Sequence, residues 1–445
     1  MRTLNSHTKS SVRVYATKEP EIYKFAVAGR KFAYDVNSMM LLTYDTNEEG
    51  DIVENAGASW QPNVPPVSRA KCRRLVFQTC YTCNLACKYC MVQKHFVEND
   101  GPVKMDMKMA QRAVHMLTPD GVGFFGGEPF MNWDFVQEFM TWFDQVQEPK
   151  IPTYSITTNG CLIVKEKVAE LQRHNVNFVF SLDGPAMIHN ELRVNHAGIG
   201  SYDAAMTGLT LLKEGGYGKK ITLRATFSPE TSHLLERTKF LNELVYRGYA
   251  SHVSVEPAYL TESTCINREQ LSYAVDDRTA DLMRDEYMQV AVWMVAEVKA
   301  GRRPSLHHLT KTIERLLYKL PALSECGAGM GYLSVDPRGD VFACHRPMST
   351  KIGNLMQGGI DERLRLPWCD NRSYASETCS TCPIRYACGG GCREESVSAY
   401  GVDNIHKPLT AACSFKNVFF ETAAWIISEL DHETLVKWIP MPGRK

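Results

Sequence analysis

The chain has 445 residues, enough for two or three domains with a large core. Its 50 Lys and Arg residues balance its 50 Asp and Glu residues, so charge gives no case for a nucleic-acid or anionic-membrane partner. The N-terminus lacks the apolar segment of a secretory signal, and no apolar run approaches the roughly 18 residues of a membrane span. We expect a cytoplasmic protein, in which 15 cysteines indicate metal sites rather than a disulfide scaffold.

Residues 1–70 are expected to form a small α+β domain that precedes the rest of the chain. Two strands joined near residues 28–30 are predicted over residues 22–36. A helix is predicted over residues 38–44, and a Pro-containing linker over residues 61–66.

Residues 71–260 alternate short apolar segments with amphipathic ones. Strand–helix units of roughly 30 residues predict parallel strands joined by right-handed crossover helices. Six units are too few for a closed eight-stranded barrel, so we expect an open, partial (β/α)6 barrel of the TIM type, with function at the C-terminal strand ends. The predicted strands are 74–78, 121–125, 154–157, 178–182, 222–226 and 253–256, and the predicted helices are 107–117, 133–146, 165–174, 201–213 and 233–247. A helical connector over 261–320 and a cysteine-rich domain over 321–445 are expected to follow.

A dense group of thiols directly follows the first predicted strand. Sulfur ligands at short spacing select zinc or an iron–sulfur cluster. A zinc site usually needs a second Cys-x2-Cys pair beyond a longer loop, and none lies nearby. Three thiolates on a four-iron cubane would leave one iron open to bind a small molecule. The four thiols are Cys80, Cys83, Cys87 and Cys90, and the last three form the pattern Cys-x3-Cys-x2-Cys.

This pattern, with Asn84, Leu85 and Tyr89 in place, resembles the cluster loop of the radical S-adenosylmethionine (SAM) superfamily. The resemblance implies that the last three cysteines hold a [4Fe–4S] cluster whose fourth iron binds SAM. It also implies reductive cleavage of SAM to a 5′-deoxyadenosyl radical that abstracts hydrogen from a substrate. The family spacing excludes Cys80 as a ligand and leaves it as a bystander or an oxidation-sensitive thiol.

Polar motifs stand at the ends of the next predicted strands. The Gly-Gly-Glu-Pro sequence at 126–129 is similar to the family's Gly-Gly-Glu motif, whose carboxylate holds the SAM ammonium. Ser181 and Arg193 match positions that in relatives hold the SAM carboxylate, a role suited to an arginine fork. The remaining candidates shape the pocket, and direct contact with SAM stays open for them. The expected SAM-binding residues are Tyr89, Gly126, Gly127, Glu128, Pro129, Thr158, Asn159, Ser181, Asp183 and Arg193.

The cysteines between residues 326 and 413 follow the order of the SPASM extension, which in relatives carries two auxiliary iron–sulfur clusters. The resemblance therefore implies three [4Fe–4S] clusters in all. A structural zinc ribbon over residues 379–392 is the alternative. The expected ligands are Cys326, Cys344 and Cys392 for auxiliary cluster I, and Cys379, Cys382, Cys388 and Cys413 for auxiliary cluster II.

Two departures from relatives concern auxiliary cluster I. Sulfatase-maturating relatives have an extra cysteine in a segment where this chain has none, at a place near Tyr332. An open iron there is expected to bind a substrate thiolate, with Cys369 as the other candidate fourth ligand. His345 stands where those relatives carry a catalytic Asp, and the Cys-His-Arg run is similar to peptide-crosslinking maturases. His345 is therefore the candidate catalytic residue, and the alternative for His345 and Arg346 is hydrogen bonding to cluster sulfur or packing.

The expected function is maturation of a ribosomally synthesised peptide, through a thioether or carbon–carbon crosslink. A precursor peptide is the expected substrate, and a flavodoxin or ferredoxin the expected electron donor. Residues 1–70 are expected to bind a leader peptide by strand pairing, or else to serve as a packing cap. Oxidation of a protein side chain, as in formylglycine formation, is one alternative. A non-catalytic iron–sulfur or zinc module is another.

Overall fold

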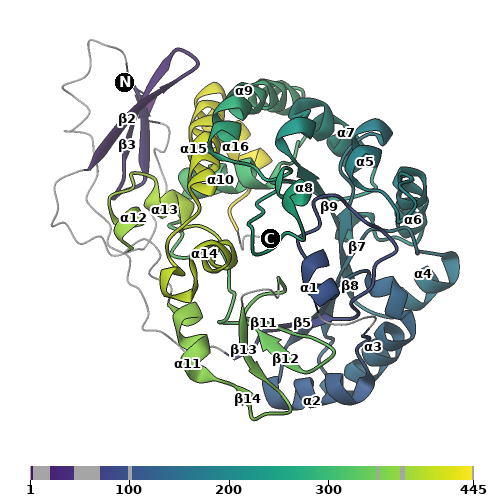
Figure 1. Ribbon diagram of the computed structural model, residues 1–445. Helices are drawn as coiled ribbons and strands as arrows, with labels where there is room; N and C mark the ends of the chain where they lie inside the picture. Colours follow the sequence, from purple (N-terminus) through teal and green to yellow (C-terminus); the bar gives the residue numbers. More distant parts are fainter. Residues whose placement is uncertain are drawn as a thin grey trace.

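The computed structural model describes residues 2–3, 21–44, 71–98, 103–346, 350–370 and 376–442. A ten-stranded sheet occupies the centre of the main body, and helices form an arc around it (Figure 1). The predicted linker at 61–66 lies outside the described residues.

Six of the ten strands are the parallel barrel strands, in the order β10-β9-β8-β7-β6-β5. The first and last of them do not pair with each other, so the barrel is open. The prediction of a partial α/β barrel is confirmed. The strands are β5 (Arg74–Gln78), β6 (Gly121–Phe125), β7 (Thr153–Thr158), β8 (Val176–Ser181), β9 (Ile221–Phe227) and β10 (His252–Pro257).

In strands β7, β8 and β9, buried side chains alternate with partly exposed ones. In β9, the buried Ile221, Leu223, Ala225 and Phe227 alternate with partly exposed Thr222, Arg224 and Thr226. Successive side chains of a strand point to opposite faces, so one face packs against the helices and the other faces the barrel interior. This alternation leaves polar groups lining the interior.

Helices connect these strands, and the five that were predicted are present. An aromatic stripe on α3, comprising Phe135, Phe139 and Phe143, packs against the outer side chains Phe77 of β5 and Phe124 of β6. Two short helices, α1 (Gln93–Glu98) and α5 (Ala186–Leu192), and three 3-10 turns, η2 (Pro129–Asn132), η3 (Gly218–Lys220) and η4 (Pro229–Thr231), were not predicted. The predicted helices are α2 (Met107–Leu117), α3 (Trp133–Gln147), α4 (Lys165–Leu171), α6 (Tyr202–Glu214) and α7 (Leu234–Tyr246).

The connector is helical as expected, with α8 (Arg268–Leu271), α9 (Asp277–Lys299) and α10 (His307–Tyr318). Strand β11 (Tyr332–Val335) of the cysteine-rich region then pairs in parallel with β5. Three further strands continue the sheet in antiparallel order: β12 (Asp340–Phe342), β13 (Lys351–Asn354) and β14 (Gly359–Ile360). The cysteine-rich region thus extends the sheet of the barrel.

The rest of the cysteine-rich region is helical. The long helix α15 packs along α9, and the two lie side by side in Figure 1. Edge-on ring contacts of Tyr287 with Phe415 and Phe419 lie in this contact. The elements are α11 (Glu362–Arg365), η5 (Leu366–Cys369), α12 (Glu377–Ser380), α13 (Arg385–Cys388), α14 (Arg393–Tyr400), η7 (Val402–Asn404), α15 (Thr410–Glu429) and α16 (His432–Trp438).

The N-terminal segment forms a separate antiparallel sheet in the order β1-β4-β3-β2. The predicted hairpin is present, and its turn places Ala28 and Gly29 at positive φ, as tight hairpin turns require. The helix predicted over 38–44 is wrong, because residues 40–43 pair with β3 and bury Leu41 and Leu42. The described part of the predicted α+β appendage is therefore all strand. Its strands are β1 (Arg2–Thr3), β2 (Ile22–Val27), β3 (Arg30–Asp35) and β4 (Met40–Thr43).

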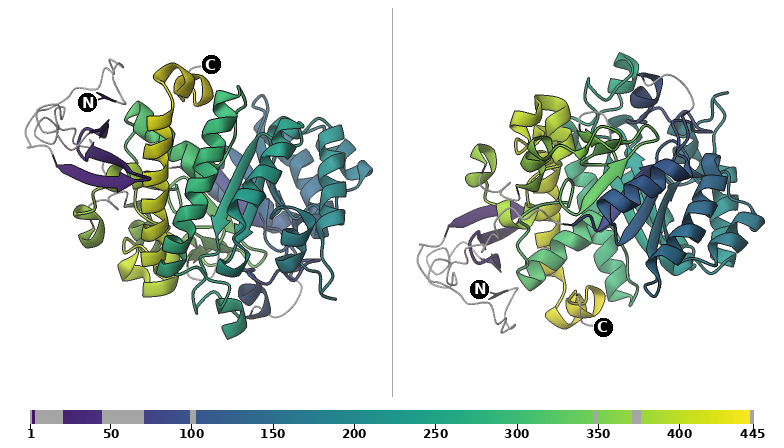
Figure 2. Two further views of the ribbon diagram at one scale, coloured as in Figure 1. Left: turned by 90° about the horizontal axis from the view of Figure 1, so that it is seen from above. Right: turned by 90° about the horizontal axis from the view of Figure 1, so that it is seen from below.

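This small sheet packs on α15, beside which it lies in both views of Figure 2. Phe420 contacts the rings of Phe25 and Tyr34, at centroid distances of 5.4 and 4.9 Å. Arg30 adds an ion pair of 2.6 Å with Glu429. The sheet is thus fixed to the cysteine-rich region rather than to the barrel strands.

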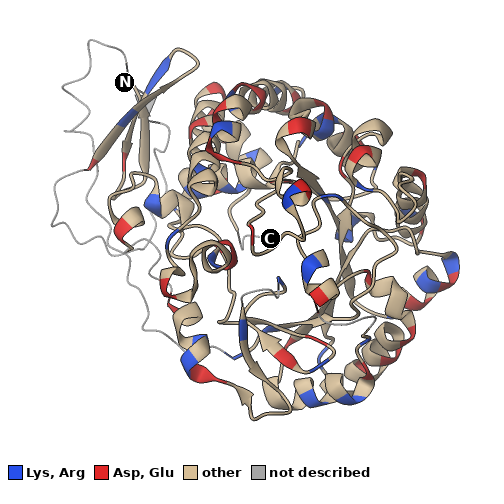
Figure 3. Cartoon of the chain, in the orientation of Figure 1, with Lys and Arg blue, Asp and Glu red and all other residues tan. Residues whose placement is uncertain are grey.

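Acidic and basic side chains are interspersed along the surface helices (Figure 3). Among the described residues, no helix combines the length and apolar character needed to span a membrane.

Candidate active site

The loop after β5 brings Cys83, Cys87 and Cys90 together, since each influences the titration of another. Burial, with Cys90 nearby and Arg193 opposing, raises the pKa of the Cys87 thiol to about 12. Thiols held this way become thiolates only beside a strong positive charge, which iron supplies. The donor set therefore fits an iron–sulfur cluster. Cys80 is fully buried and donates to the backbone oxygens of Thr82 and Glu128.

The Gly126-Gly127 pair packs directly against the backbone of the cluster loop. Gly126 has φ +124°, and a Cβ there would lie 2.8 Å from the carbonyl oxygen of Cys80. A Cβ at Gly127 would overlap the carbonyl oxygen of Thr82. The two amides Gly127 N and Glu128 N donate to those same two oxygens, at 2.9 and 3.0 Å. The absence of side chains thus lets the turn brace the loop that carries the thiols.

Glu128 is held in place by the residues that follow β7. Its Oε1 accepts a hydrogen bond from the Thr158 hydroxyl (2.7 Å), and its Oε2 accepts one from Asn159 N (2.8 Å). Burial raises the pKa of Glu128 to about 7, against the opposing hydrogen bonds. Asn159 also donates through Nδ2 to Asn84 of the cluster loop, at 2.9 Å. Pro129 is buried and begins the turn η2.

Asp183, beyond β8, is the centre of a second polar group. Its carboxylate accepts a hydrogen bond from the Tyr89 hydroxyl at 2.5 Å and pairs with Arg193 Nε at 3.0 Å. Burial opposes its ionisation, but Arg193, Arg237 and His189 together lower the pKa of Asp183. Arg193 also reaches toward Cys87, with Nη1 3.9 Å from Sγ. Asp183 therefore orients Arg193 beside the cluster thiols.

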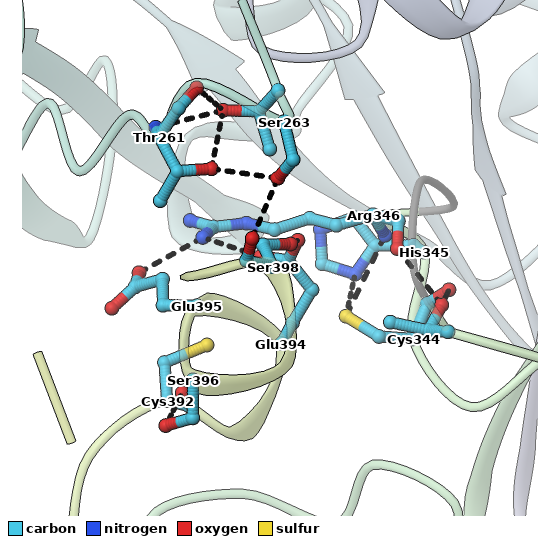
Figure 4. A network of polar contacts seen from close by, with 12 residues as sticks. Thr261, Ser263, Cys344, His345, Arg346, Cys392, Glu394, Glu395, Ser396 and Ser398 are labelled. Atoms are coloured by element: carbon cyan, nitrogen blue, oxygen red, sulfur yellow. Dashed lines mark hydrogen bonds and ion pairs between the residues drawn. The ribbon is translucent and has the colours of Figure 1, made fainter. Parts of the chain in front are cut away.

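The candidate ligands of auxiliary cluster I come from three distant segments. Arg346 lies among them, since the charges of Cys344 and Cys392 both act on it, and Cys326 acts on Cys344. Figure 4 shows Arg346 reaching Glu394 and Glu395 of α14, with N–O distances of 3.3 and 2.9 Å. The cation offsets two carboxylates that are almost fully buried beside the thiols.

His345 lies between the two cluster regions. Its Nδ1 is 2.6 Å from the Tyr332 hydroxyl, and its ring packs edge-on against Phe125 at 4.6 Å. Burial, assisted by Arg346 and Arg224, lowers the pKa of His345 to about 3, so the imidazole is neutral near pH 7. Tyr332, the residue near the missing cysteine, lies close enough to Cys326 and Cys344 for both charges to act on it.

The four candidate ligands of auxiliary cluster II also come together, as Cys388, Cys379 and Cys382 all act on the titration of Cys413. The thiol of Cys369, the other candidate fourth ligand of auxiliary cluster I, lies 3.6 Å from the carbonyl oxygen of Gly329. Among the described residues, no three His, Cys, Asp or Glu side chains are arranged to hold a single metal ion.

One open cavity of about 170 Å³ connects the cluster loop with His345 and Arg346. Its wall includes the three cluster-loop thiols, residues 126–128, and His345 and Arg346 of the cysteine-rich region. Of the expected SAM contacts, the cavity wall contains all except Pro129 and Asp183, which stand behind it. Two further charged residues line it that the sequence motifs did not single out, Arg224 of β9 and Glu256 of β10. The alternating pattern of β9 was the available signal for Arg224.

The model of the radical SAM superfamily matches residues 77–239. Radical SAM cyclopropyl synthase TigE of Paramaledivibacter caminithermalis is 24% identical over 74% of this chain and 69% of its own length. The cysteine-type anaerobic sulfatase-maturating enzyme of Clostridium novyi is 26% identical, over 70% of this chain and 85% of that enzyme. Mycofactocin maturase MftC of Mycobacterium tuberculosis is 26% identical, over 72% and 77% respectively.

Among solved structures, native anSMEcpe with bound AdoMet superimposes on 80% of this chain and 98% of that one, with a TM-score of 0.64 at 18% identity. That likeness shows a shared fold. Radical SAM enzymes use SAM and a [4Fe–4S] cluster. The thiols of the cluster loop and the adjoining cavity fit these two groups. Residues 77–239 of this chain thus form a radical SAM domain, and peptide and protein maturases are among the chain's homologues.

Proposed function

We propose that this protein is a radical SAM maturase that crosslinks side chains of a ribosomally made peptide, through a thioether or a carbon–carbon bond. The observation that supports this most is the shared cavity. Its wall combines the cluster-loop thiols with His345 and Arg346 from the cysteine-rich region. A substrate in this cavity would lie between the site where hydrogen is abstracted and auxiliary cluster I.

The residues have distinct proposed roles. Cys83, Cys87 and Cys90 hold the first cluster, and SAM bound there supplies a 5′-deoxyadenosyl radical that takes one hydrogen atom from the peptide. Glu128 would bind the SAM ammonium. Arg193, oriented by Asp183, would donate hydrogen bonds to the SAM carboxylate. The proposed ligand sets of the auxiliary clusters are those given above, with an open iron in auxiliary cluster I near Tyr332.

Neutral His345 is proposed to contact the substrate from the side of auxiliary cluster I. Its imidazole, fixed by Tyr332 and Phe125, meets the cavity without adding a charge. A histidine with a pKa of about 3 is a weak base, which favours positioning over proton transfer.

Leader recognition is proposed for the N-terminal sheet. Strand β2 is the last in the order β1-β4-β3-β2 of the described strands, the position at which a peptide strand would add to the sheet. A flavodoxin or ferredoxin is the proposed electron donor.

The reaction is tested with the anaerobically reconstituted enzyme, SAM, a reductant and the short peptides encoded beside its gene. A crosslink lowers the peptide mass by about 2 Da, because one hydrogen atom goes to 5′-deoxyadenosine and one further proton and electron leave as the bond closes. An auxiliary cluster would accept that electron, and solvent would take the proton. Tandem mass spectra should lose the fragments between the joined residues. A hydrazide-reactive aldehyde would favour side-chain oxidation instead, and unchanged mass for every peptide would contradict the proposal.

A further inference from the structure

Three guanidinium groups line the cavity, and two of them have anionic partners. Arg193 pairs with Asp183 at 3.0 Å, and Arg346 pairs with Glu394 and Glu395. Arg224 makes no hydrogen bond or ion pair through its side chain with any described residue. A guanidinium partly withdrawn from water favours an anion, and a planar fork favours a carboxylate.

The carboxylates of the cavity wall are already engaged. Glu128 accepts hydrogen bonds from Thr158 and Asn159. Glu256 lies 2.7 Å from His308 Nε2 and accepts a hydrogen bond from the Ser254 hydroxyl at 2.5 Å. The wall therefore offers Arg224 no partner at contact distance.

The position of Arg224 separates it from the expected place of the SAM carboxylate. Arg193 Nη1 lies 3.9 Å from Sγ of Cys87 in the cluster loop. Arg224 lines the same cavity from β9, together with Glu256 of β10 and His345 of the cysteine-rich region. An anion bound to Arg224 would thus share the cavity with His345, the residue proposed to contact the substrate.

We propose that Arg224 binds a carboxylate of the peptide substrate, either its C-terminal carboxylate or an Asp or Glu side chain. This inference rests on the proposed function and adds a substrate requirement to it. The substrate would present a carboxylate beside the residue that reacts.

The test uses four small probes in ligand-observed NMR titrations of the anaerobic holoenzyme with SAM bound. Acetyl-Gly-Gly carries a C-terminal carboxylate, and acetyl-aspartyl amide carries only a side-chain carboxylate. Acetyl-Gly-Gly amide and acetyl-asparaginyl amide are their neutral counterparts. We expect one of the two acids to bind about tenfold more tightly than its neutral counterpart, as a charge-assisted pair with arginine predicts. Which acid binds identifies the source of the carboxylate.

Variants assign the effect to Arg224. Arg224→Gln should remove the preference for the acid, and Arg224→Lys should retain part of it, because the ammonium keeps the charge but loses the fork. Arg363→Gln is the control, since Arg363 is 91% exposed and pairs with Asp361 on the surface. Iron content verifies that each variant is folded. The comparison of each acid with its neutral counterpart in the unaltered enzyme tests the inference even if a variant fails to fold.

Equal affinity for acids and neutral probes, or an acid preference that survives Arg224→Gln, would overturn the inference. 5′-Methylthioadenosine lacks the carboxylate of SAM. A preference for the acid probes that appears only when this compound replaces SAM would assign Arg224 to the SAM carboxylate, and would also overturn the inference. Formation of 5′-deoxyadenosine is measured in the same samples. If the unaltered enzyme forms it while the acids fail to bind, the inference fails and the proposed SAM chemistry stands.

Discussion

Two glycines and one glutamate determine the shape of the cluster loop. The backbone of residues 126–128 contacts the backbone of residues 80–82 so closely that no side chain fits between them. The motif therefore has a packing role in addition to its proposed role in binding SAM. This packing role could not be predicted from the motif, because it depends on the adjacent placement of β5 and β6.

Gly127→Ala tests this packing. The added Cβ overlaps the carbonyl oxygen of Thr82, so the loop must shift, and we expect the loss of about four of about twelve irons per chain. Gly331→Ala is the matched control, because its Cβ would make only ordinary contacts of 3.6 Å or more. Full iron content in Gly127→Ala would contradict the account.

Glu128 predicts a pH dependence. Burial raises its pKa to about 7, so the carboxyl becomes protonated as the pH falls through that value. The proposed SAM ammonium requires the ionised form, so SAM affinity should fall about tenfold from about pH 8 to about pH 6. The same raised pKa makes the protein without SAM lose stability as the pH rises from 4.5 to about 7.

Equilibrium binding of SAM across this pH range measures the effect. Glu128→Gln should bind weakly at every pH and show a flat profile over that range. A flat profile in the unaltered protein would remove Glu128 from the SAM site.

At the scale of elements, the repeat of short apolar segments and amphipathic ones predicted the partial barrel. Strands β5 and β6 begin and end where the sequence indicates, because continuous apolar runs bounded by turns leave little choice. Residues 38–44 were misassigned, because a short apolar run suits a helix or a strand equally. Pairing of residues 40–43 with β3 makes this segment a strand. The parallel pairing of β11 with β5 joins residues about 258 positions apart, which no local pattern indicates.

The contact between α14 and the loop after β12 rests on one ion-paired group. Arg346→Gln leaves Glu394 and Glu395 buried without their cation, so we expect the free energy of unfolding to fall by about 3–5 kcal/mol. Arg363→Gln breaks an exposed pair and should leave the free energy of unfolding nearly unchanged. Chemical denaturation of both variants measures the difference, and equal stability would contradict the role of Arg346.

The N-terminal sheet depends on α15 in a comparable way. Phe420 is 1% exposed and contacts the rings of Phe25 and Tyr34. Phe420→Ala should cost about 3–5 kcal/mol and increase proteolytic cleavage within residues 21–44. Leu364→Ala, at a position 48% exposed, is the control and should leave both measurements nearly unchanged. Unchanged cleavage in Phe420→Ala would show that the sheet is held by other contacts.

At the scale of the whole molecule, one continuous sheet connects the barrel to the cysteine-rich region. Its parallel half presents the cluster loop, the 126–128 turn and Arg193, while the extension through β11 and β12 presents His345 and Arg346. The spacing of the cysteines indicated three sets of thiols, and the structure brings the same three sets together. Arg224 and Glu256 were not among the predicted site residues, because they belong to no motif and meet the cavity only through the curvature of the sheet.

The central claim is that Cys83, Cys87 and Cys90 hold a cluster that supports SAM cleavage. The direct measurement is 5′-deoxyadenosine formed by the reduced, anaerobically reconstituted protein, beside a variant with all three cysteines changed to alanine. We predict about twelve irons per chain and steady 5′-deoxyadenosine formation in the unaltered protein. In the variant we predict about eight irons and no product. Zinc in place of iron, or product formation that persists in the variant, would contradict the account.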